Sequence, residues 1–68
     1  MLGESDDRLM TLTDLSEMLS IPVHTLYAWR QRGQGPVGYR IGRYVRYRRS
    51  AVEAWLEGRA DHMNERLR

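Results

Sequence analysis

The chain has 68 residues, no cysteine and a formal net charge of +2, which predicts one small domain without disulfides or thiolate metal sites. Its only imidazole ligands are His24 and His62, and neither a metal cluster nor a phosphate-cradling loop is recognisable, so we expect no metal, no cofactor and no enzyme. No apolar run approaches the ~18 residues needed to cross a bilayer, so we expect a cytoplasmic protein with no membrane partner.

The first helix is expected over residues 12–19. Thr11 is a suitable N-cap, and Asp14 three residues later can reach back to it, which is the capping-box pattern. An apolar stripe at helical spacing follows, made of Leu12, Leu15 and Leu19. The acidic residues 1–9 that precede this helix are expected to be disordered.

The second helix is expected from about Val23 to Arg32. Pro22 fits a helix start because its missing amide proton costs nothing there, and Gly33 fits the left-handed position after a helix end. Arg30 falls nearer the core side, with its stem packed and its head in solvent. The core face is predicted to carry Pro22, Val23, Leu26 and Trp29. The opposite face, its flanks and the C-terminal end carry His24, Thr25, Tyr27, Ala28, Gln31 and Arg32.

Two short helices joined by a tight turn are typical of the helix-turn-helix, although any antiparallel helix pair gives the same spacing. The stretch that follows, GPVGYRIGRYVRYRRS over residues 35–50, alternates apolar residues with arginines around Gly42 and predicts a two-stranded antiparallel hairpin, or wing. A two-residue turn would pair Arg40 with Val45 and mix the two kinds of side chain. A three-residue loop instead pairs Arg40 with Arg46. We favour this loop because it separates an arginine face from an apolar face of Tyr39, Ile41, Val45 and Tyr47.

The third helix is expected to begin at Ser50 and to end at Gly58, with Glu53 completing a second capping box. The residues expected to be buried on it are Val52, Trp55 and Leu56. Residues 59–68 form a mostly polar tail. A weak amphipathic helix in this tail is compatible with the spacing of Ala60, Met63 and Leu67. The domain is therefore expected over residues 10–58, as a small α+β fold with three short helices and a hairpin.

Basic charge is concentrated in the middle of the chain. Residues 18–52 contain seven arginines and no acid, whereas residues 1–17 contain one arginine and five acids. Like charges placed opposite each other weaken an antiparallel pair by up to about 1 kcal/mol, so Arg40 beside Arg46 makes little sense for folding alone. Arginine binds phosphate oxygens bidentately, and double-stranded DNA is therefore the expected partner.

Residues 11–58, TLTDLSEMLSIPVHTLYAWRQRGQGPVGYRIGRYVRYRRSAVEAWLEG, resemble the small winged helix-turn-helix domains related to the MerR group, and most closely the phage and prophage excisionases. The resemblance is carried by the capped first helix, TLYAW in the second, the wing YRIGRYVRY and the third helix RRSAVEAWL. It implies a second helix in the major groove and a wing in an adjacent minor groove. It also implies that the protein bends attachment-site DNA and directs an integrase towards excision.

The resemblance and the helical wheel select the same groove-facing residues on the second helix, namely His24, Ala28 and Gln31. The other candidate contacts on this helix are Thr25, Tyr27 and Arg32. The wing and its flank add Arg40, Arg43, Tyr44, Arg46, Arg48 and Arg49. Ala28 offers only an apolar contact, for example to a thymine methyl, so phosphate contacts and DNA shape are expected to supply much of the affinity. His24 as a merely solvated residue, and Tyr44 as a packing residue, remain open alternatives.

Three hypotheses of function remain. The first is an excisionase in a bacterial or phage-infected cell, associated with the nucleoid, with an integrase as partner and head-to-tail self-association on DNA. The second is a small MerR-like transcriptional regulator of phage or host genes. Full MerR regulators carry a long dimerisation helix and an effector domain, for which 68 residues leave no room. The third is a protein-interaction or antitoxin-like domain with an acidic partner, which a weak salt dependence of DNA binding would reveal.

Overall fold

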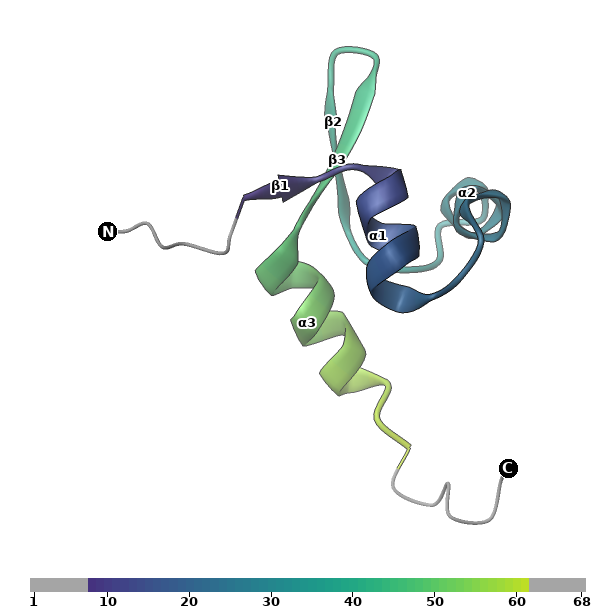
Figure 1. The fold of residues 1–68 in the computed structure, drawn as a ribbon, viewed down its shortest axis with the longest axis vertical. Helices are drawn as coiled ribbons and strands as arrows, with labels where there is room; N and C mark the ends of the chain where they lie inside the picture. Colours follow the sequence, from purple (N-terminus) through teal and green to yellow (C-terminus); the bar gives the residue numbers. More distant parts are fainter. Residues whose placement is uncertain (1–7, 62–68) are drawn as a thin grey trace.

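The computed structural model describes residues 8–61, which form three helices and a three-stranded antiparallel sheet (Figure 1). The sheet has the strand order β1-β3-β2. This is the predicted winged helix-turn-helix, with α1 and α2 as the helix pair and β2 and β3 as the wing. The elements in chain order are β1 (Leu9–Met10), α1 (Leu12–Leu19), α2 (Val23–Gln31), β2 (Gly38–Ile41), β3 (Tyr44–Arg48) and α3 (Arg49–Gly58).

The predicted capping box starts α1. Thr11 Oγ1 accepts a hydrogen bond from the Asp14 amide at 3.0 Å, and Asp14 Oδ2 accepts one from the Thr11 amide at 2.9 Å. The first bond satisfies one of the amides that a helix start leaves without a partner. At the other end, Ser20 adopts a left-handed φ of 58°, and Ser16 Oγ donates to the Ile21 carbonyl at 2.6 Å. These contacts turn the chain sharply towards α2.

α2 has nearly the expected bounds. Pro22 is its N-cap rather than its first helical residue, and the Pro22 carbonyl accepts hydrogen bonds from the Thr25 and Leu26 amides at 3.0 and 3.2 Å. At the other end Arg32 is the C-cap, and Gly33 has a φ of 73° that glycine adopts without strain. The two helices are thus joined through residues 20–22, the short turn that the helix-turn-helix pattern predicts.

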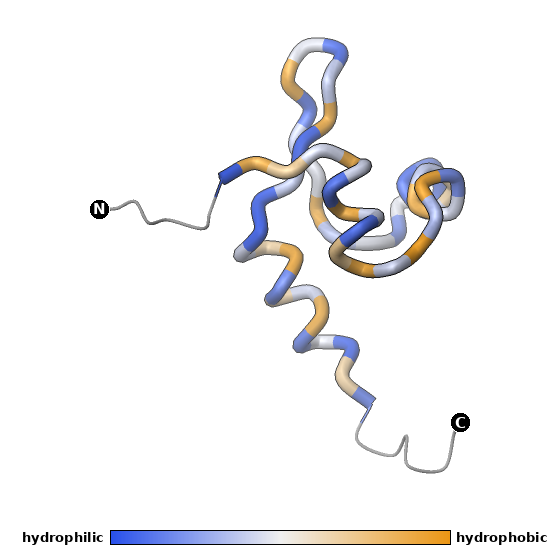
Figure 2. Tube along the Cα trace, in the orientation of Figure 1, coloured by the Kyte–Doolittle hydropathy of each residue, from blue (hydrophilic) through white to orange (hydrophobic). Residues whose placement is uncertain are grey.

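The core is small and draws one buried side chain from each element except β2. Its members are Met10, Leu15, Leu26, Tyr47 and Val52. Fully burying a side chain of this size contributes about 1.5 to 3 kcal/mol. Partly buried side chains pack around these five, among them Leu12, Met18 and Leu19 of α1, Trp29 of α2 and Val45 of β3. Figure 2 shows that hydrophobic segments also continue into the wing, beyond this core.

β1 is a correction to the prediction, which extended disorder through residue 9. Leu9 pairs with Arg48, and Met10 pairs with Tyr47, so β1 adds a third strand to the wing. Two residues are too few to show the alternation by which a strand is recognised in sequence. Residues 1–7 lie outside the described part of the chain.

The wing adopts the register that the sequence analysis rejected. Its paired residues are Gly38 with Tyr47, Tyr39 with Arg46, Arg40 with Val45, and Ile41 with Tyr44. The two-residue turn between the strands has Gly42 at a φ of 63°, as in the tight hairpin turns that begin with glycine and match the strand twist. Tyr47 is buried, and a Cβ on Gly38 would lie 3.0 Å from Tyr47 Cε2. The predicted pairing would have placed Tyr39 there, where even a Cβ lies in tight contact with the ring.

This register distributes the arginines over both sides of the sheet, because residues opposite each other share a face. The inner sheet face, which packs on the core, carries Met10, Gly38, Arg40, Val45 and Tyr47. The outer sheet face carries Leu9, Tyr39, Ile41, Tyr44, Arg46 and Arg48. The predicted separation of an apolar face from an arginine face is therefore wrong, and Arg40 and Arg46 lie on opposite faces.

α3 begins one residue earlier than predicted and without the second capping box. Arg48 is the N-cap in an extended conformation and makes no side-chain capping bond, and Ser50 is already helical. Because β3 runs directly into α3, the last strand residue takes the cap position. Glu53 instead forms an ion pair with Arg49, with 3.5 Å between Oε2 and Nε. Met63 and Leu67, on which a tail helix would depend, lie outside the described residues.

Several predicted core residues are only partly buried. Val52 is fully buried, but Leu56 on α3 is 39% exposed and Val23 on α2 is 41% exposed. Trp29 and Trp55 are half-buried and contact each other, with ring centroids 6.1 Å apart and planes inclined by 51°. For Leu56 the physical reason is that α3 runs away from the sheet (Figure 1), so the start of the helix lies nearest the core.

Replacing Gly38 with alanine should destabilise the fold, because overpacking beside a buried ring costs about 1 to 3 kcal/mol. The free energy of unfolding in urea measures the effect. Gly58→Ala is the matched control, since a Cβ there meets nothing within 4 Å and losing a helical glycine should stabilise by about 0.5 to 1 kcal/mol. Equal stability of the two variants would contradict the packing of Gly38 on Tyr47.

Stability should also depend on pH through Asp14, whose pKa is lowered from its ordinary value of 3.8. The Thr11 amide is the main cause, followed by the Thr11 hydroxyl, with smaller contributions from Arg46 and Arg8. A depressed folded-state pKa contributes stability above the unfolded-state pKa, and this stability is lost as the pH falls through the folded-state value. Asp14→Asn should therefore lower stability at pH 7, and its difference from wild type should shrink below about pH 4. Urea denaturation across pH, with Glu17→Gln as control, checks this; an identical pH profile for both variants would refute it.

Candidate nucleic-acid interface

α2 presents a polar surface to solvent on the side away from the core. All six of its predicted DNA contacts have at least partial solvent access. His24, Tyr27, Gln31 and Arg32 are exposed, whereas Thr25 and Ala28 are half-buried. Arg32 Nη1 donates a hydrogen bond to Gln34 Oε1 at 3.2 Å, which holds that guanidinium beside the C-terminal end of the helix. The helical wheel therefore placed these residues on the accessible side of α2.

The wing returns to α2 and forms a shallow notch with it. This α2–β2 notch has a volume of about 390 Å³ and is lined by Tyr27, Arg30, Gln31 and Arg40. Arg40 comes from the inner sheet face near the tip of the wing, and the other three come from the last turns of α2. Two guanidinium groups beside a phenol and an amide form a site suited to a phosphate group. The structure thus joins predicted residues from the second helix and the wing.

Arg30 is a candidate interface residue that sequence reasoning missed. The helical wheel places it towards the core, and it is indeed half-buried, yet it lines the notch with Arg40. A wheel describes α2 alone and contains no information on where β2 passes. The one available signal was the long stem of arginine, which allows a partly buried residue to present its charge at the surface.

The wing separates the other predicted contacts. Arg43 is exposed in the turn at the tip. On the outer sheet face, the guanidinium carbon of Arg46 lies 5.4 Å from the centroid of the Tyr44 ring, and that of Arg48 lies 5.6 Å from the Tyr39 ring. These are cation–π distances. Three of the predicted contacts, Tyr44, Arg46 and Arg48, therefore lie on the opposite side of the sheet from Arg40.

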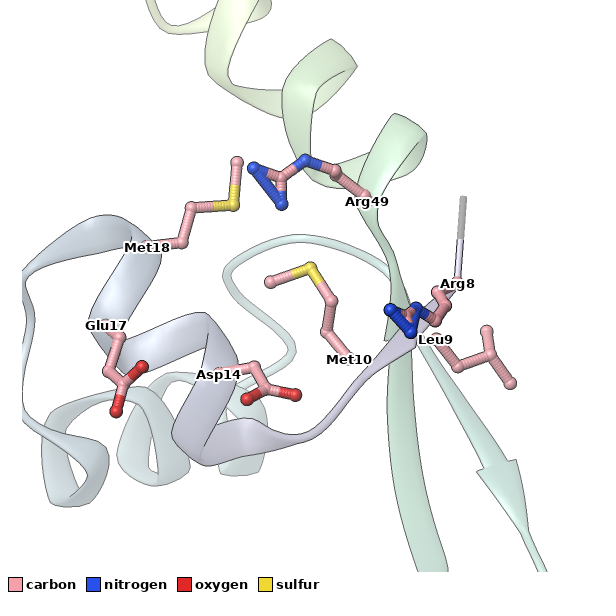
Figure 3. A pocket seen from close by; sticks show the side chains of 7 residues that line it. All are labelled: Arg8, Leu9, Met10, Asp14, Glu17, Met18 and Arg49. Atoms are coloured by element: carbon pink, nitrogen blue, oxygen red, sulfur yellow. The ribbon is translucent and has the colours of Figure 1, made fainter. Parts of the chain in front are cut away.

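Arg49 lies in a different part of the molecule. It borders an open pocket of about 790 Å³ between β1, α1 and the start of α3 (Figure 3). Figure 3 shows Asp14 and Glu17 on α1, with Arg49 across the opening. Arg49 also forms the ion pair with Glu53. The two carboxylates offset the charges of Arg49 and of Arg8, which also lines this pocket, so it is a poorer site for phosphate than the notch. The structure does not bring Arg49 together with α2.

Residues 8–61 contain neither of two further classes of site, a metal site and a membrane-spanning helix. No group of three or more histidine, cysteine, aspartate or glutamate side chains in that range could hold a metal ion. None of the helices described there combines the length and the apolar character needed to span a membrane.

The fold is that of a winged helix-turn-helix domain, a class that binds DNA. A family model described as "Helix-turn-helix domain" matches residues 9–60, and the chain belongs to this family. It is a small DNA-binding protein, and its partner is double-stranded DNA. Searches of curated proteins and of solved structures gave no significant match. The matched range contains all the described helices and strands, including β1.

Replacing Arg40 with glutamine should weaken binding to duplex DNA of any sequence. When one phosphate contact is lost, DNA binding releases one counterion fewer. The magnitude of the slope of log K against log salt then falls by about 0.9. Fluorescence anisotropy titrations at several salt concentrations measure both quantities. Arg49→Gln removes the same charge from the pocket that contains Asp14 and Glu17 and should leave the slope unchanged. The interface would be wrong if Arg49→Gln reduced the slope and Arg40→Gln did not.

Proposed function

We propose that this protein is an excisionase, an architectural protein that binds double-stranded DNA with sequence preference, bends attachment-site DNA and directs an integrase towards excision. The observation that carries the proposal is the α2–β2 notch. Because Arg30 and Arg40 come from the helix and the wing, one duplex can be held by both elements at once. A helix in one groove and a wing in the next neutralise phosphate charge, and this favours bending of the duplex. The energy cost of bending depends on the DNA sequence.

In this proposal the residues of α2 divide into base contacts and phosphate contacts. Gln31 and His24 donate or accept hydrogen bonds at base edges in the major groove, and the Ala28 methyl group meets a thymine methyl. The phosphate contacts come from Thr25, Tyr27, Arg30, Arg32 and Arg40. Arg43 at the wing tip enters a minor groove, where a narrow groove attracts arginine electrostatically.

Four predicted contacts are left outside this interface. Tyr44, Arg46 and Arg48 belong to the outer sheet face, and Arg49 borders the pocket with Asp14 and Glu17. A duplex that occupies the α2–β2 notch lies on the other side of the sheet from the first three. Phosphate binding is therefore assigned to fewer arginines than the charge of the chain suggests.

The role with an integrase rests on the resemblance of the helices and the wing to those of excisionases. The same resemblance supports head-to-tail binding of several copies along an attachment site. Such side-by-side binding would appear as a series of evenly phased protections in a footprint, whereas a single operator would give one protected region.

A second candidate function is a small MerR-like transcriptional regulator. The observation that favours it is the apolar surface of α3, where Leu56 is 39% exposed and Trp55 is half-buried. Helix-turn-helix dimers bind two half-sites about one helical turn apart. An exposed apolar stripe on a projecting helix is where a second protomer of such a regulator would pack.

In vitro recombination on a plasmid that carries attachment sites tests the proposal directly. With a cognate integrase, the protein should stimulate excision, Arg40→Gln should weaken both DNA binding and stimulation, and Arg49→Gln should keep both. The measured quantity is the fraction of excised circle. Tight binding to a promoter without stimulation of excision would refute the excisionase role and favour the transcriptional regulator. A flat salt dependence of binding, or the absence of binding to any duplex, would refute both.

A further inference from the structure

The chain leaves α2 through a turn that lies beside Arg32, one of the phosphate contacts proposed on that helix. The Gly33 amide donates a hydrogen bond to the Arg30 carbonyl at 3.1 Å. The Gln34 amide donates one to the Trp29 carbonyl at 2.8 Å. Together these bonds form a Schellman motif, with Gly33 in the left-handed conformation at a φ of 73°. The backbone of Gln34 therefore has a fixed position relative to the end of α2.

A pair of tryptophans supports this turn. Gly35 also has a positive φ, of 88°, and a Cβ there would lie 3.4 Å from Trp29 Cε3. The backbone of the turn therefore lies against the Trp29 ring. This ring in turn contacts Trp55 of α3, with the two centroids 6.1 Å apart. Hydrogen bonds and packing thus hold the turn together, and Gln34 lies between its two glycines.

The side chain of Gln34 reaches back to Arg32. Arg32 Nη1 donates to Gln34 Oε1 at 3.2 Å, and both side chains are exposed. A guanidinium has no acceptor atom, so the amide oxygen must face it, and the Nε2 amide group remains as a donor for a ligand. The last carbonyls of α2, to which an arginine at a helix end can bind, already accept the Schellman bonds. The pair therefore presents two kinds of donor at one place, which suits the oxygens of a phosphate.

We propose that Gln34 is a further DNA-binding residue, which orients Arg32 and donates through Nε2 to the same backbone phosphate. A long side chain loses rotamer freedom when it binds, and one that a neighbour already holds loses less. Because Gln34 is neutral, it holds the guanidinium without offsetting its charge, as a carboxylate at the same place would. The inference rests on the proposed placement of Arg32 against the duplex and does not need the excisionase role.

Gln34→Ala tests the proposal in the full chain, by fluorescence anisotropy on a non-specific duplex. Affinity should fall about 2- to 10-fold, which is the cost of ordering one long side chain. The slope of log K against log salt should stay at the wild-type value, because Arg32 still neutralises its phosphate. In an Arg32→Gln background the same substitution should have less effect, because the residue that it orients is absent. Equal losses in the two backgrounds would overturn the proposal.

Gln34→Glu separates the orientation of Arg32 from its charge. The carboxylate keeps an acceptor for the guanidinium but offsets its charge and repels phosphate, so the magnitude of the slope should fall by about 0.9. Ala54→Glu is the matched control, because it adds the same charge at an exposed position of α3, away from the proposed interface, and should leave the slope unchanged. Equal slopes in the two variants would contradict the proposal, since they would indicate an effect of net charge alone.

Two further measurements distinguish an error about Gln34 from an error about the interface. Arg32→Gln alone should lower the magnitude of the slope by about 0.9. If it does so while Gln34→Ala binds as wild type, only the role of Gln34 is wrong. If neither variant changes binding, Arg32 lies outside the interface, and the inference is overturned together with that placement. In urea, Gln34→Ala should be as stable as wild type because the side chain is exposed; a loss of stability that accounts for the weaker binding would also overturn the proposal.

Discussion

The contact between Tyr47 and Gly38 determines how this domain presents its charge. The Tyr47 side chain is 3% exposed, and its cross-strand partners are Gly38 on β2 and Met10 on β1. Gly38 has no Cβ, and a Cβ there would lie 3.0 Å from Tyr47 Cε2, so glycine gives the ring the most room. A slip of one residue would exchange the two faces of the wing. With Tyr47 turned inward, Arg40 lies beside α2 and Arg46 lies on the outer sheet face, so a steric fit in the core selects which arginines can share a phosphate site.

The helix pair depends on the same small core. Met10 and Tyr47 are buried together with Leu15 of α1 and Leu26 of α2, so the wing and α2 are both held by one cluster. The capping box at Thr11 follows directly after β1. The pairing of β1 with β3 therefore also positions the start of α1. A notch formed by two elements needs this rigidity, because a phosphate contact that uses both requires their guanidinium groups to keep a fixed separation.

The sequence was sufficient where the signals are local. The bounds of α1 follow from its capping box and leucine stripe, and the accessible face of α2 follows from its helical period. The wing register was not predictable in this way, because alternating residues fit either turn and the choice rests on Gly38 meeting a ring nine positions later. The predicted N-cap at Ser50 was wrong for a related reason. β3 continues directly into α3, and Arg48 takes the cap position. Arg30 was missed because its role depends on the path of β2.

A sheet that binds a polyanion on one side has a general difficulty. Side chains alternate between its two faces, so a strand such as YVRYR that is rich in arginine leaves some of this charge on the face away from the DNA. Such charge would attract phosphates in unproductive orientations, since non-specific binding follows charge rather than sequence. In this chain the register of the wing decides how that charge is divided, because it places Arg40 on the inner sheet face and Arg46 and Arg48 on the outer sheet face.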